Sequence, residues 1–438
     1  MLTTLKNALK VKEIRQRILF TIMMLVVIRI ASQLPVPGTD RNYFADWFAA
    51  QTGDAFNFFD AFTGGSFLNM SIIALNITPY ITSSIIIQLL TIAIPKLEEM
   101  QRDGEEGRKK LVAITRYVTI ALSILEASAM AIGFGRQGLL ENYNAFNVIT
   151  VIVALTAGSA FLMWVGERIT EKGIGNGISI VLTINIISRL PQELNALFKQ
   201  FVFSRNVAAG VVAAVLIVAI ILAMIVLVIL LNAAIRKIPV QYAKKVQGRK
   251  MMGGSSQNIP LKVNTSGVIP VIFASSIMQF PVIICALIGV DGGTSIGGHI
   301  LKMLSSNNWC KPSTPVYSIG LLIYVLLVIF FAYFYTSITF NPLEVAENMK
   351  KQGGFIPGIR PGKPTSDYLT RVLNYIVFIG AVGLSIVCVI PFIFSGVFGA
   401  SVSFGGTSLI IIVSVIIDTL KQIESKMLVR NYKGFLND

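Results

Sequence analysis

The sequence predicts an all-α membrane protein with ten transmembrane helices. Of its 438 residues, 54% are hydrophobic and 13% are charged, which leaves no room for a soluble domain of ordinary size. A helix needs about 20 residues to cross a hydrocarbon core of about 30 Å, and it satisfies its own backbone hydrogen bonds in lipid. The ten apolar segments are residues 18–34, 72–94, 111–134, 145–165, 178–190, 207–231, 263–290, 316–338, 369–394 and 403–420.

Charge predicts how the segments are oriented. The chain has a net charge of +15, and most of its 37 Lys and Arg residues lie at the two tails and in alternate gaps between the segments. Cytoplasmic loops carry the excess of Lys and Arg, so both the N-terminus and the C-terminal tail, 421–438, are predicted to be cytoplasmic. Residues 1–17 are expected to form a basic helix at the membrane surface rather than a cleavable signal.

The residues give little support for catalysis or metal binding. The single histidine, His299, lies in a glycine-rich external loop, and no HExxH, GxSxG or P-loop motif occurs. The glycine-rich stretch 173–177 is expected to turn the chain into the fifth segment. Cys285, Cys310 and Cys388 lack CxxC spacing, so no disulfide framework is expected. We predict no catalytic residue, no metal and no cofactor.

The second and seventh segments are too polar for helices that face only lipid. Both contain prolines and several Ser, Thr, Asn or Gln residues. Such groups belong against protein or water. One interpretation is hydrogen bonding between packed helices; the other is a pair of interrupted helices that face a transport pathway.

Two further stretches depart from ordinary spans. The fifth segment is short, so it either continues to Phe203 as a tilted helix or crosses only part of the bilayer. The external stretch 56–68 contains four phenylalanines in seven residues, 56–62, which should not lie in open water. Because it is too short to span, we expect a re-entrant half-helix packed inside the protein, with Gly64 and Gly65 as a flexible joint.

Two predicted cytoplasmic connections, 232–262 and 339–367, are much longer than the usual links between bundle helices. Both are basic. A projecting basic loop can bind anionic groups such as RNA phosphate or an acidic protein patch. The candidate docking residues are Lys244, Lys245, Arg249, Lys250 and Arg360.

Several long motifs resemble the bacterial SecY family. They are residues 76–90, 104–110, 173–180, 267–277, 355–362 and 404–409, and the resemblance covers essentially the whole chain in order. It implies two inverted pseudo-symmetric halves, 18–200 and 201–420, around a central pore. It also implies a protein-conducting channel of the general secretory pathway in the bacterial plasma membrane, which translocates unfolded polypeptides and releases transmembrane segments sideways into lipid.

The resemblance also implies roles for individual residues. The pore ring, an aliphatic waist, would consist of Ile77, Ile81, Ile178, Leu182, Ile272 and Ile411. Leucine at 182 departs from an all-isoleucine ring but conserves volume. The plug, residues 57–70, would include Phe58, Phe59, Phe62, Gly64, Gly65 and Phe67. The lateral gate would include Thr78, Thr82, Gln88, Glu126, Ser275, Ser276 and Gln279; an equal alternative makes Glu126 a residue hydrogen-bonded inside the bundle.

The implied partners are the small subunits SecE and SecG, the SecA ATPase or the ribosome on the cytoplasmic loops, signal peptides, unfolded polypeptides and membrane lipids. The main alternative is a secondary transporter for a small solute, which would also contain broken helices. A transporter normally concentrates ionisable residues at the midplane, where Glu126 is the one clear candidate. A lipid-embedded enzyme would need convergent reactive side chains within the spans, and the sequence has none.

Overall fold

The structure is a computed structural model that describes residues 9–40, 63–140, 142–203, 207–242, 245–247, 250–252, 256–288, 296–398 and 406–434. The helices of the first half are α2 (Lys12–Ala31), α5 (Thr78–Ala93), α6 (Pro95–Arg102), α7 (Glu105–Phe134), α8 (Ala145–Lys172) and α9 (Gly177–Phe198). Those of the second half are α10 (Val207–Ala233), α11 (Ile269–Ile288), α12 (Ile296–Leu304), α13 (Ile319–Thr339), α14 (Pro342–Lys351), α15 (Lys363–Phe398) and α16 (Gly406–Gly434).

The protein is a multi-pass membrane protein. Among the described residues, 5 helical stretches are long and apolar enough to cross a membrane, or 6 if the α5–α6 pair, bent by 103°, counts as one span. These stretches belong to α7, α8, α10, α13 with the following α14, and α15. The count of ten spans stays a prediction.

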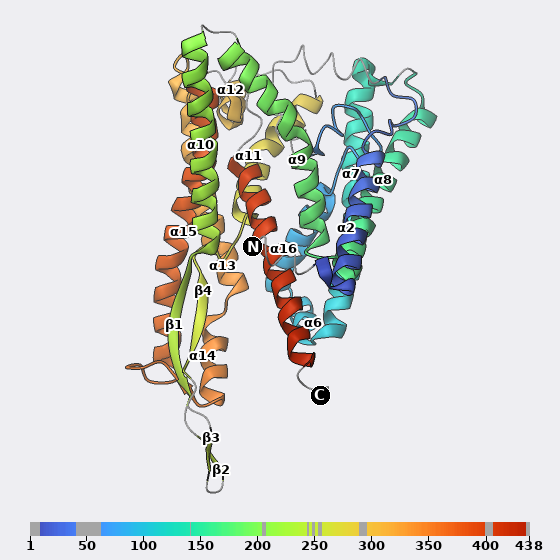
Figure 1. Cartoon of the computed structure of the whole chain (residues 1–438). Helices are drawn as coiled ribbons and strands as arrows, with labels where there is room; N and C mark the ends of the chain where they lie inside the picture. The colour runs from blue at the N-terminus through green and yellow to red at the C-terminus, as the bar shows by residue number, and fades with distance from the viewer. Residues whose placement is uncertain are drawn as a thin grey trace.

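The helices pack in two groups. Figure 1 shows α2, α7 and α8 on one side, α10, α13 and α15 on the other, and α9 and α16 between them. The first group encloses a core built from α7, α8 and the segment that precedes α5, with Phe67, Met70 and Leu155 at its centre. The second encloses a core around Tyr324, Val328 and the neighbouring helices. The groups meet where α7 contacts α11 and where α9 contacts α16.

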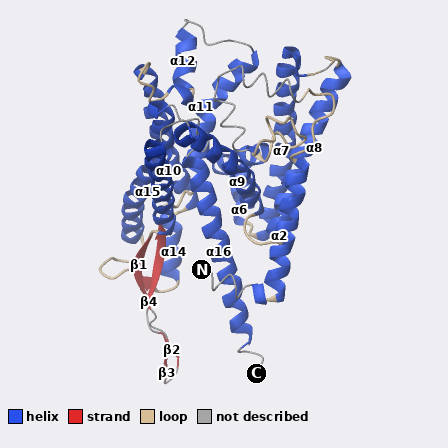
Figure 2. Cartoon of the chain, turned by 45° about the horizontal axis from the view of Figure 1, so that its top comes forward, coloured by secondary structure: helices blue, strands red, loops and turns tan. Residues whose placement is uncertain are grey.

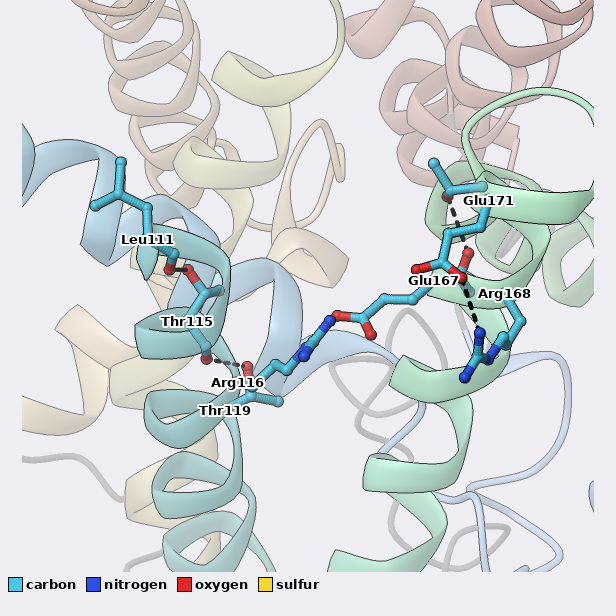
Figure 3. A network of polar contacts seen from close by, with 9 residues as sticks. Leu111, Thr115, Arg116, Thr119, Glu167, Arg168 and Glu171 are labelled. Atoms are coloured by element: carbon cyan, nitrogen blue, oxygen red, sulfur yellow. Dashed lines mark hydrogen bonds and ion pairs between the residues drawn. The ribbon is translucent and has the colours of Figure 1, made fainter. Parts of the chain in front are cut away.

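An ion pair joins two helices of the first group (Figure 3). Arg116 Nε on α7 lies 2.7 Å from Glu167 Oε1 on α8. The hydroxyls of Thr115 and Thr119 instead donate to backbone carbonyls of their own helix, at 2.9 and 2.7 Å. Because the Arg116 side chain is half-exposed, this pair orients the helices more than it stabilises them.

A small β-sheet projects from one end of the bundle, opposite α12 (Figure 2). Strand β1 (Ile235–Tyr242) pairs antiparallel with β4 (Ser256–Lys262), and β5 (Gly354–Phe355) pairs with the other edge of β1. At the tip, β2 (Lys245–Gln247) pairs with β3 (Lys250–Met252). The sequence predicted two long basic connections here without a sheet. The structure adds that β5 brings the second connection onto the hairpin formed by the first.

The two unusual stretches have different outcomes. The fifth segment takes the longer of its two alternatives, since α9 continues to Phe198 and a π-helical turn, η2, covers Lys199–Phe203. At 1.5 Å per residue, the 22 residues of α9 span about 33 Å. The expected half-helix is wrong for residues 64–70, which form successive turns. Residues 57–62 lie outside the described part of the chain.

Candidate functional site

An aliphatic cluster lies where the two groups of helices meet. Leu182 on α9 and Ile411 on α16 are buried in it, and Ile81 on α5 and Ile272 on α11 pack against it. Two of these helices belong to each half of the chain. The other members described, among them Ile186, Leu190 and Val268, are also aliphatic, so apolar side chains from both halves pack together here.

The other two residues of the predicted pore ring lie in an adjoining cluster. Ile77 is fully buried there and Ile178 packs against it. Ile81 belongs to both clusters. The structure therefore brings all six predicted residues into one continuous, mainly aliphatic region, which also contains Tyr80 and Phe161, although nothing in the packing alone assigns that region a role.

Helix starts position these side chains. Pro79 lies in the first turn of α5, where its missing N–H costs nothing, and Ile77 is the N-cap. At the start of α9, the side chain of Asn176 accepts hydrogen bonds from the backbone N–H groups of Ile178 and Ser179, at 3.1 and 3.4 Å. These caps fix where each helix begins, and so which residues face the cluster.

Buried amides lie beside the aliphatic region. Asn185 Nδ2 donates to Asn76 Oδ1 at 2.9 Å. In the second half, Asn264 donates to Asn232 at 2.9 Å, and Asn232 donates to Ser414 Oγ at 2.8 Å. Asn185, Asn232 and Ser414 are not among the site residues predicted from the sequence. A polar residue inside a largely apolar segment is the signal that could have found them.

Only part of the predicted plug can be placed. Phe58, Phe59 and Phe62 lie outside the described residues. Gly64 and Gly65 have φ of +68° and +85°, a backbone region that favours glycine. Phe67 is buried with Met70 against α7 and α8.

The lateral-gate residues lie on three helices, and α7 contacts both α5 and α11. Thr82 Oγ1 donates to the carbonyl of Thr78 at 3.0 Å, and Ser275 Oγ donates to the carbonyl of Val271 at 2.8 Å. These hydroxyls are therefore satisfied within their own helices. The remaining residues are Gln88 and Ser276, both exposed, Glu126 on α7, which is half-buried, and Gln279 on α11, whose side chain is not described.

The docking residues that the structure describes gather at the end that carries the sheet. Lys244 and Arg249 lie outside the described residues, while Lys245 and Lys250 lie on the paired strands β2 and β3. Arg360 is exposed in the turn that follows β5, and its carbonyl accepts a hydrogen bond from Thr365 Oγ1 at 2.8 Å. Sheet pairing thus connects the two predicted docking loops.

His299 is exposed, but it lies in the short helix α12 rather than in a loop. Its Nδ1 is 3.0 Å from the hydroxyl of Tyr317. Within the described part of the chain, no group of three or more His, Cys, Asp or Glu side chains could hold a metal ion.

Comparison with known proteins decides the family. The SecY family model matches residues 71–420. The chain belongs to the SecY family. It is 43% identical to the protein translocase subunit SecY of Halalkalibacterium halodurans, 42% to that of Streptomyces galbus and 40% to that of Mycobacterium tuberculosis, over the full length of each pair.

Solved structures show the same fold. A structure described as that of a protein conducting channel has a TM-score of 0.64 and 20% identity, covering 95% of this chain and 94% of that one. Sec61 in a canine ribosome-channel complex has a TM-score of 0.62 with the same identity and coverage. The SecY family is one of translocation channels, so this chain is a protein-conducting channel of the secretory pathway, not an enzyme. The predicted fold class is confirmed.

Proposed function

We propose that this SecY-family chain is the channel subunit of the Sec translocon in the bacterial plasma membrane. It translocates unfolded polypeptides through the pore ring and releases transmembrane segments sideways into the bilayer. The observation that carries this proposal is the aliphatic region to which four helices, two from each half, contribute. Because side chains from both halves close the pore, it opens when the halves move apart. A channel that passes a polypeptide needs such an opening.

The chemistry of the pore ring suits a gate that must seal against ions and yet pass many sequences. Aliphatic walls resist wetting and hold no fixed charge. A passing chain meets flexible side chains such as Leu182 and Ile272 rather than a coordinated site, so the ring imposes little selectivity for sequence. The seal then re-forms by hydrophobic contact.

Transmembrane segments would leave the channel sideways at the seam where α7 contacts α11. The hydroxyls of Thr82 and Ser275 are satisfied by their own helices, so these bonds survive when the seam opens. Opening then costs mainly apolar packing, which the apolar part of a signal peptide or a lipid tail can replace.

The proposed partners are SecA or the ribosome at the β1–β5 sheet and its basic tip, with SecE and SecG alongside the helices. The joining of both basic connections in one sheet supports this, because it makes one projecting surface at the end that the Lys and Arg distribution predicts to be cytoplasmic. No nucleotide-binding loop occurs in the sequence, so the energy for translocation comes from a partner or from the membrane potential.

The test is ion conductance of the purified complex in a planar bilayer, with and without residues 57–70. We expect an intact complex that is silent and a deletion variant that conducts. Silence of both forms, together with accumulation of a small solute in vesicles, would replace this proposal with a transporter.

A further inference from the structure

The joint of the proposed plug meets α9 at one backbone position. A Cβ placed on Gly64 would lie 2.7 Å from the carbonyl oxygen of Asn185, 3.0 Å from its Cα and 2.9 Å from Ser188 Oγ. Two of these atoms are helix backbone, which cannot move aside cheaply. Only glycine allows this approach, quite apart from its positive φ.

The neighbouring glycine makes no such contact. A Cβ on Gly65 would lie no closer than 3.7 Å to any atom, and its nearest neighbours are on the flexible side chain of Arg189. Both glycines have positive φ, +68° and +85°. Alanine variants at Gly64 and Gly65 can therefore distinguish the effect of close contact with α9 from the effect of a strained backbone.

The side chain of Asn185 is hydrogen-bonded to the residue that precedes Ile77 of the proposed pore ring. Asn185 Nδ2 donates to Asn76 Oδ1 at 2.9 Å, and both side chains are buried. Asn76 has φ of +53°, uncommon for a non-glycine residue, and it immediately precedes Ile77. Leu182 lies three residues before Asn185 on α9, hence on nearly the same face.

We propose that Asn185 is the seat of the plug. Its backbone carbonyl lies against Gly64 at the joint of the plug, and its side chain is hydrogen-bonded to Asn76 at the start of α5. One residue thus couples the plug to the pore ring in the closed channel. This inference rests on the proposed function, because residues 57–70 must act as a plug for a seat to matter. Asn185 acts as a positioning residue and need not contact the translocating chain.

The coupling has a direct consequence for gating. When the joint leaves α9, the close contact of Gly64 with Asn185 is lost, while the Asn185 carbonyl keeps its hydrogen bond from Ser188 Oγ at 2.6 Å. Loss of the amide pair then frees the start of α5, which carries Ile77 and Ile81. A single buried hydrogen bond is weak enough to break in each cycle. Its loss should nevertheless shift the closed-to-open equilibrium by about tenfold.

The experiment compares ion conductance of four purified complexes in planar bilayers with that of the parent. The four are Gly64→Ala, Gly65→Ala, Asn185→Leu and the deletion of residues 57–70. We expect Gly64→Ala and Asn185→Leu to raise the open fraction about tenfold, while Gly65→Ala, which is equally strained but unobstructed, stays within about twofold of the parent. Gel filtration checks that each complex assembles. If the Gly64→Ala complex does not assemble, the inference is tested by Asn185→Leu alone.

Three results would overturn the inference. If the deletion variant conducts while Asn185→Leu stays silent, residues 57–70 act as a plug but Asn185 does not hold it. If Gly64→Ala and Gly65→Ala conduct equally, backbone strain rather than contact with Asn185 is responsible. If the deletion itself is silent, the proposed plug fails and the seat fails with it.

Discussion

Ile81 belongs to both of the hydrophobic clusters that contain the proposed pore ring. It lies on the first turns of α5 and packs against residues from both halves. We expect Ile81→Ser to raise resting ion conductance about tenfold, because a hydroxyl and a lost side chain let water enter a gate that works by staying dry. The matched control is Ile92→Ser on the same helix, where the side chain is 55% exposed. Equal leakage from both variants would contradict the pore ring.

Arg360 provides a residue-scale test of the docking surface. Its exposed guanidinium lies in a turn tied to the start of α15 by the Thr365 hydrogen bond. We expect Arg360→Glu to lower SecA-dependent translocation into membrane vesicles about tenfold or more, as loss of a central interface residue does. Lys363→Glu, at another exposed position nearby, makes the same change in net charge and should cost much less. Unchanged translocation by Arg360→Glu would show that partners dock elsewhere.

The sequence predicted the aliphatic residues of the waist through their motifs, but it did not predict their polar neighbours. Asn185 and Asn76 are 109 residues apart, and Asn232 and Ser414 are 182 apart. Nothing in local spacing indicates such pairs. They depend on which helices pack together, and each residue by itself could be a helix-packing contact or a cavity-facing group.

Helix α8 contacts the segment that leads from the proposed plug into α5, and one glycine makes the contact possible. A Cβ on Gly158 would lie 2.0 Å from the carbonyl oxygen of Ile72, and Ile72 is itself held by a backbone hydrogen bond to Leu34. We expect Gly158→Ala to destabilise the protein by about 1–3 kcal/mol through overpacking, seen as a lower midpoint of thermal unfolding in detergent.

The control for this prediction is Gly297→Ala on α12. Nothing lies within 4 Å of a Cβ there, so alanine should be neutral or stabilise the helix by up to about 1 kcal/mol. A midpoint that falls equally in both variants would show that the contact between α8 and Ile72 is not tight.

At the scale of elements, the sequence succeeded where periodicity is local and failed where pairing is distant. The apolar segments produced helices because each satisfies its own hydrogen bonds. The sheet was missed because β5 joins β1 from the other long connection, where Gln241 pairs with Phe355. The half-helix expected around Gly64 was wrong for residues 64–70 because two positive-φ glycines favour turns over a helix.

For the whole molecule, composition and motifs predicted most of the architecture. High hydrophobicity with charge confined to connections indicated a multi-pass bundle, and the order of the SecY-like motifs indicated the family. The way the halves meet could not be read from these patterns. It depends on contacts between distant helices, such as α7 with α11 and α9 with α16, and the same packing brings residues of α5, α9, α11 and α16 into one aliphatic cluster.

The most direct test of the account is to trap a translocating polypeptide and ask which side chains it passes. A photo-crosslinking amino acid is placed at Ile272 in the pore ring or, on the same helix, at Ile277, whose side chain is 48% exposed. With a secretory protein stalled in transit, we expect strong crosslinks from position 272 and few from position 277. Crosslinks from 277 with none from 272 would show that the polypeptide takes another path and would contradict the central claim.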